Sequence, residues 1–132
     1  MLWDLLPDGL KEFFDIESYE KTDIIFRLVL IEKNILPSLP EEYRGKKVIN
    51  TVTKSSTVDY FPIKGRKCEL ILKRRFWKFD NVEKMLSRSV DICAEGTKIE
   101  KKFADFLKEN GFNNVAEFDR YCYSESSESQ NI

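Results

Sequence analysis

Hydrophobic and polar residues alternate along several stretches of the chain, and this period of two residues predicts β-strands. Residues 23–34 are aliphatic on nearly both faces, so we expect a strand that is central or covered by a helix. Residues 66–79 predict the longest strand, after a tight turn at Gly65. Residues 80–87 favour a loop. The strands expected from the pattern are residues 23–34, 47–53, 57–63, 66–79 and 88–94.

Helical spacing appears near both ends of the chain. Residues 5–14 predict a short helix, because one helical face would collect Leu6, Leu10, Phe13 and Phe14. Near the other end, Thr97 and Glu100 form the T-x-x-E pattern of a capping box, which predicts a helix that begins at Thr97. That helix is expected to end at residues 110–111, which are Asn and Gly, and residues 114–122 predict a second, weaker helix.

The order helix, strands, helix predicts the α+β class with a mainly antiparallel sheet of about four to five strands. We expect residues 1–96 to form an α+β domain that contains the basic strand. Residues 97–122 are expected to form a helical segment packed on that domain. Residues 123–132 are polar and of low complexity, which predicts a disordered tail.

Composition narrows the function classes. The chain has 132 residues, three cysteines at wide spacing and no histidine, which argues against a disulfide framework, a zinc site and a His-dependent general base. No catalytic motif is present, so we expect neither an enzyme nor a cofactor. The sequence has no apolar run long enough to span a membrane and does not begin like a signal peptide, so we expect a cytoplasmic protein without membrane contact.

Charge is unevenly distributed along the chain, although the formal net charge is only −1. Residues 44–78 hold eleven basic side chains against Asp59 and Glu69, whereas the segments before and after them are net acidic. A basic segment of this kind is typical of contact with nucleic acid.

The long strand predicted at residues 66–79 concentrates these cations. A period of two places Leu70, Leu72, Arg74 and Phe76 on one face and Ile71, Lys73, Arg75 and Trp77 on the other. Cations contact phosphates and an adjacent flat ring can stack on a base, so we expect Lys73, Arg75 and Trp77 to share an exposed binding face. A structural interpretation remains open, in which these are solvated cations at a sheet edge. The candidate nucleic-acid-binding residues are Lys64, Arg66, Lys67, Lys73, Arg74, Arg75, Trp77 and Lys78.

Three stretches give the chain a resemblance to a known family. They are "LLPDGLKEFFDI", "VDYFPIKGRKCELILKRRFW" and "EGTKIEKKFADFLKE", in that order over roughly residues 5–109. Together they resemble the N-terminal region of bacterial insertion-sequence transposases, whose DDE-type catalytic part lies downstream or in a separate reading frame. By this resemblance, Phe61 to Arg66 and Lys73 to Trp77 match the basic turn and strand of that group.

The resemblance implies a non-catalytic module that binds double-stranded DNA at the terminal inverted repeats and works with a catalytic DDE subunit. Related transposases carry a zinc ribbon here, but this chain lacks the paired cysteines, so the ribbon-like sheet would have no metal. The alternative is a protein–protein adaptor whose basic strand docks an acidic partner. The oligomeric state is left open by the sequence, and association of several copies is compatible with it.

Overall fold

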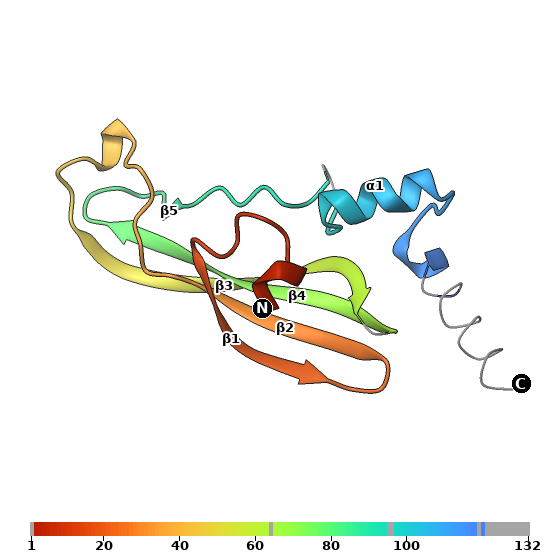
Figure 1. The fold of residues 1–132 in the computed structure, drawn as a ribbon. Coiled ribbons are helices and arrows are strands. Elements are labelled where there is room, and N and C mark those ends of the chain that lie inside the picture. The colour runs from red at the N-terminus through yellow and green to blue at the C-terminus, as the bar shows by residue number, and fades with distance from the viewer. Residues whose placement is uncertain (1, 64, 95–96, 119, 121–132) are drawn as a thin grey trace, which may run out of the picture. The chain divides into compact units, whose positions relative to one another are not determined.

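The computed structural model describes residues 2–63, 65–94, 97–118 and 120 (Figure 1). It is an α+β fold with a mainly antiparallel open sheet and short helices, which confirms the predicted class. The elements are the 3-10 helices η1 (Leu2–Leu5) and η2 (Glu41–Tyr43), the strands β1 (Phe14–Lys21), β2 (Ile25–Glu32), β3 (Val48–Ile63), β4 (Arg66–Phe79) and β5 (Leu86–Ser87), and the helix α1 (Lys101–Glu109).

The strands form a sheet in the order β1-β2-β4-β3, so β1 and β3 are the edge strands of this path. The short β5 lies off this path and pairs antiparallel with β4, with Trp77 opposite Leu86. Tight turns join β1 to β2 and β3 to β4, as in antiparallel hairpins. Residues that are hydrogen-bonded between β2 and β4 lie 42 or 43 positions apart in the sequence at both ends of the pair. This constant separation means that the two strands run parallel.

The chain divides into two compact units. Unit 1 comprises Met1–Ser18, Val29–Ser56 and Ile71–Asp91, and unit 2 comprises Tyr19–Leu28, Thr57–Leu70 and Ile92–Ile132. Each of the four long strands contributes residues to both units, and α1 belongs to unit 2. The domain boundary at residue 96 stays a prediction, and the predicted tail at residues 123–132 lies outside the described residues.

The core of unit 1 gathers around aromatic residues at the end of β4. Trp77 and Phe79 are buried together with Tyr43 and Leu86. The rings of Tyr43 and Phe79 meet edge to face at 5.0 Å, and the Tyr43 hydroxyl donates a hydrogen bond to the Lys84 carbonyl at 2.8 Å. The short helix η2 therefore closes over the end of β4 through one buried tyrosine whose polar tip is satisfied.

The core of unit 2 forms where α1 packs on the sheet. Phe103, Leu107 and Phe118 are buried there, and the Phe103 ring lies 4.9 Å from that of Phe61 on β3. Burial also raises the pKa of the Cys68 thiol to about 12, so this cysteine is a protonated packing residue at neutral pH. Phe103 and Leu107 lie on the face of α1 that packs.

The helix predicted for residues 5–14 is wrong. Its apolar residues are buried as expected, since Leu10 and Phe14 are each 1% exposed, but the backbone forms turns that lead into β1. Pro7 disfavours the helical conformation of the residue before it, and Gly9 adopts a φ of +92°, which lies outside the helical region. The spacing of the apolar residues reflected burial and not helix formation.

Two strand boundaries also differ from the prediction. The expected strands 47–53 and 57–63 are one continuous strand, β3, because the exposed residues 54–56 sit on an edge strand where polar side chains reach water. Residues 88–94 do not form a strand beyond the single bridge between Cys93 and Glu100. The last strand is β5, inside the predicted loop, where it pairs with β4.

The N-cap of α1 is Glu100 and not Thr97. The Glu100 carboxylate accepts a hydrogen bond from the Phe103 backbone N–H at 2.9 Å, whereas the Thr97 hydroxyl donates to the Ala94 carbonyl. The predicted end of the helix is confirmed, with Asn110 as C-cap and Gly111 at a φ of +77°. Residues 115–118 are helical, and the rest of the second predicted helix is only partly within the described residues.

This assignment makes a stability prediction. Replacing Glu100 with alanine removes a buried cap, and we expect the free energy of unfolding to fall by about 1 kcal/mol. Glu100→Gln keeps an acceptor oxygen and should lose less. Urea denaturation measures both variants. A larger loss in Thr97→Ala than in Glu100→Ala would contradict the assignment.

Candidate nucleic-acid interface

The basic strand β4 changes its buried side along its length. Leu70 and Leu72 are buried at even positions, whereas Trp77 and Phe79 are buried at odd positions further on. Because side chains alternate between the two faces of a strand, the buried face of β4 changes between Leu72 and Trp77. Alternation alone therefore does not predict which face of β4 is buried past Leu72.

Trp77 is the clearest correction to the predicted site. Its side chain is 1% exposed, and its Nε1–H donates a hydrogen bond to Asn34 Oδ1 at 2.9 Å. The expectation that Trp77 shares an exposed face with Lys73 and Arg75 is wrong, because the ring fills the core of unit 1. A ring in that place cannot stack on a base.

Arg75 lies beside a buried carboxylate. Glu32, at the end of β2, is 1% exposed and accepts a hydrogen bond from the Arg75 backbone N–H at 2.9 Å. The Arg75 guanidinium in turn donates from Nη2 to the Glu32 backbone carbonyl at 3.2 Å. The second Glu32 oxygen pairs with Arg88 Nε at 3.3 Å. Glu32 is therefore the centre of a network that holds cations on both sides of it.

Arg74 joins the same part of unit 1. Its Nη2 donates to the Arg88 carbonyl at 2.7 Å, and its guanidinium lies over the Phe76 ring at 5.8 Å. Within the described residues, the Nε atoms of Arg74 and Arg75 are buried without a hydrogen-bond partner. These arginines are engaged within the fold and do not present their full fork to a ligand.

The other candidate residues also contact their own chain. Lys73 pairs with Glu17 on β1, and both side chains are about one third exposed. Lys78 donates to the carbonyls of Val82 and Glu83. The Arg66 Nε donates to the Thr22 carbonyl at 2.6 Å, Lys67 lies near Asp59, and Lys64 lies outside the described residues. The structure thus brings the candidate residues into several separate intramolecular contacts and not onto one open face.

Among the described cations of residues 44–78, the exposed ones lie in residues 44–54. This stretch holds Arg44, Lys46, Lys47 and Lys54 and no acidic residue, and all four side chains are exposed. Among the described residues, none forms an ion pair with Arg44, Lys46 or Lys47, and Lys54 Nζ rests 5.0 Å from the centroid of the Phe76 ring. We call these four residues the basic loop-strand segment. These four residues are among the eleven cations of residues 44–78. The predicted binding residues lay at 64–78 instead, because the strand at residues 66–79 has the more regular pattern.

No chemistry beyond charge is apparent in this region. In the described part of the chain, no three His, Cys, Asp or Glu residues are placed to hold a metal ion. The helices seen there are too short and too polar for any of them to span a membrane. Comparisons with protein-family models, with curated proteins and with solved structures found no match to this chain, so its resemblance to insertion-sequence transposases stays a prediction.

Proposed function

We propose that this chain is a non-catalytic DNA-binding module of an insertion-sequence transposase, and that it binds duplex DNA through the basic loop-strand segment. The observation that carries the proposal is the exposure of Arg44, Lys46, Lys47 and Lys54 in a stretch without an acidic residue. Exposed cations that form no ion pair with a described residue are free to neutralise phosphates, whereas most cations of β4 are already bonded within the chain.

The geometry of the segment fits a phosphate backbone. Lys47 and Lys54 are seven residues apart; Lys47 directly precedes the edge strand β3 and Lys54 lies within its first half. At about 3.3 Å per residue, an extended segment of that length covers roughly 23 Å, or about seven base-pair steps of duplex DNA. Its cations can therefore reach different phosphates and act additively.

The biological context of the proposal comes from the sequence resemblance. The module would act in the cytoplasm and bind the terminal inverted repeats of the element. A separate catalytic subunit of the DDE type would supply the metal ions and carboxylates for strand transfer. This division of labour fits a chain whose sequence contains no recognisable catalytic motif.

Salt dependence tests the proposed surface. In Lys46→Ala/Lys47→Ala, binding to duplex DNA should weaken, because two phosphates are no longer neutralised. The slope of log K against log salt should flatten by about 1.8, or about 0.9 for each of these phosphates. Fluorescence anisotropy with a labelled duplex, repeated from low to moderate salt, measures this slope.

Two matched variants control the experiment. Lys101→Ala/Lys102→Ala removes the same charge from α1 in unit 2, and Lys73→Ala removes a cation that is paired with Glu17. Both should leave the slope within about half a unit of the wild-type value, because neither removes a proposed phosphate contact. An unchanged slope in the Lys46/Lys47 variant, or an equal change in the Lys101/Lys102 variant, would contradict the proposed surface.

One observation favours the alternative, a protein adaptor. Val48 and Ile49 are 38% and 61% exposed on the same edge strand, directly after the cations. An acidic segment of a partner could pair with this edge and cover both side chains. Ile49→Thr separates the two functions, because it should leave duplex binding unchanged if DNA is the ligand. A chain that fails to bind duplex DNA at low salt would shift the assignment to the adaptor.

A further inference from the structure

Two hairpin turns lie side by side in unit 2. The turn between β1 and β2 is closed by a hydrogen bond from the Thr22 N–H to the Ile25 carbonyl. Arg66, the first residue of β4, donates from Nε to the Thr22 carbonyl at 2.6 Å. The backbone N–H of Lys67 donates to the Ile24 carbonyl at 3.1 Å. We call the two joined ends, residues 21–25 and 65–67, the hairpin tip.

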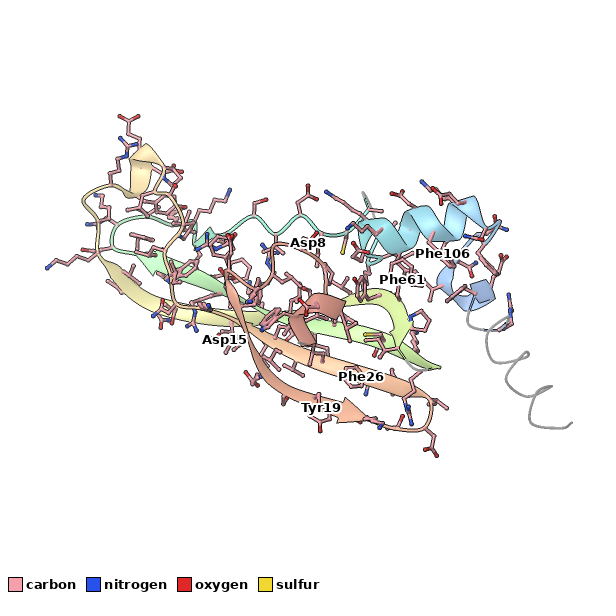
Figure 2. All side chains as sticks on the ribbon, in the orientation of Figure 1. Asp8, Asp15, Tyr19, Phe26, Phe61 and Phe106 are labelled. Atoms are coloured by element: carbon pink, nitrogen blue, oxygen red, sulfur yellow. The ribbon has the colours of Figure 1, made fainter. Side chains whose placement is uncertain are left out.

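An aromatic pair stands next to this tip. Tyr19 on β1 and Phe26 on β2 stack with their ring centroids 5.9 Å apart and their planes at 16° (Figure 2). The Tyr19 side chain is nevertheless 66% exposed. Because Phe26 covers one face of the Tyr19 ring, this exposure belongs largely to the opposite face and the ring edge. A flat aromatic surface is therefore left largely open to solvent.

Two cations, Lys21 and Arg66, belong to the same pair of hairpins as the open ring. Lys21, two residues after Tyr19, is exposed. Arg66 donates to the Thr22 carbonyl through its Nε. Arg27 pairs with two carboxylates, Glu69 at 2.8 Å and Glu20 at 3.7 Å, which raise its pKa, so this group is net negative and offers no cation to a ligand. Asp23 is the acidic residue of the tip itself. The charge available to a ligand therefore comes from Lys21 and Arg66, on the two different hairpins.

We propose that the hairpin tip binds single-stranded nucleic acid, with an unpaired base stacked on the open face of Tyr19 and neighbouring phosphates on Lys21 and Arg66. Open rings beside cations suit this ligand, because every base has a stacking face and every nucleotide carries a phosphate. Bases inside a duplex are stacked on one another and cannot reach the ring, so the ligand is an unpaired strand. The inference rests on the proposed function for its ligand class, and it adds a second site, in unit 2, with a different strand preference.

Binding to a single strand tests the inference. The probe is a labelled 20-nucleotide oligo-dT, measured by fluorescence anisotropy at low salt. Tyr19→Ala should weaken its binding by roughly 5- to 150-fold, the range that corresponds to the loss of one base–aromatic stack. Tyr19→Phe keeps the ring and should bind within about twofold of the wild type. Tyr19 is exposed, so the urea midpoint of either variant should stay close to the wild-type value, which excludes unfolding as the cause.

The outcomes separate this inference from the proposed function. Wild-type binding of duplex DNA without binding of oligo-dT overturns the inference alone, and failure to bind either probe overturns both. Equal loss of both probes in Tyr19→Ala also overturns the inference, because duplex DNA offers no unpaired base. Polyglutamate, a polyanion without bases, should bind equally well to wild type and Tyr19→Ala. If the variant loses polyglutamate and retains oligo-dT, the tip binds acidic proteins instead.

Discussion

Replacing Glu32 with alanine should lower the free energy of unfolding by about 3–5 kcal/mol, the usual cost of removing one partner from a buried ion pair. Glu32 is 1% exposed and the side chain of its partner Arg88 is 14% exposed, so water screens the pair only slightly. The substitution leaves the Arg88 charge without its carboxylate and the Arg75 N–H without an acceptor. Urea denaturation followed by circular dichroism measures the loss.

A second carboxylate provides the control for this effect. Glu17 pairs with Lys73 in the same unit, but both side chains are about one third exposed. Glu17→Ala should therefore cost no more than about 1 kcal/mol. Glu32→Gln, which keeps the size and one acceptor oxygen, should fall between the two variants. If Glu32→Ala lowered the free energy of unfolding no more than Glu17→Ala, the buried network around Glu32 would not stabilise the fold as its geometry indicates.

Trp77→Ala should also cost about 3–5 kcal/mol, because it removes a large side chain that is 1% exposed and leaves a cavity beside Tyr43, Phe79 and Leu86. Trp77→Phe should cost less, since a ring still fills part of the space and the exposed Asn34 can bond to water instead. Urea denaturation measures both changes. Replacing a tryptophan on the surface would change the free energy of unfolding by no more than about 0.5 kcal/mol.

The same substitution separates the two interpretations of the basic strand. If Trp77 were a base-stacking residue, Trp77→Phe would preserve stability and keep a stacking ring, while Trp77→Ala would lower DNA affinity without unfolding the chain. We expect the opposite. Trp77→Phe should bind duplex DNA like the wild type, and any loss of binding in Trp77→Ala should follow its loss of folded protein.

Much of the fold followed from local patterns in the sequence. The strand at Ile25–Glu32, the long strand at Arg66–Phe79 and the end of α1 at Asn110 all lie close to their predicted places. Each has a regular apolar period or a strong stop signal that acts within a few residues. The segment before β1 failed because Leu6, Leu10 and Phe14 are spaced for burial, while Pro7 and Gly9 prevent a helix.

The sequence by itself determined the α+β class, the strands at Ile25–Glu32 and Arg66–Phe79 and the positive charge of residues 44–78, but it gave no signal for β1. Only the tertiary structure decided which of those charges remain open. Lys73 meets Glu17 across 56 residues and Arg75 meets Glu32 across 43, and pairings at such separations leave no local pattern. The burial of Trp77 also depends on residues distant in the sequence. Tyr43 packs against it, and Leu86 lies opposite it because β5 pairs with β4. Alternation predicts which residues share a side of a strand, but the neighbouring elements determine which side is buried.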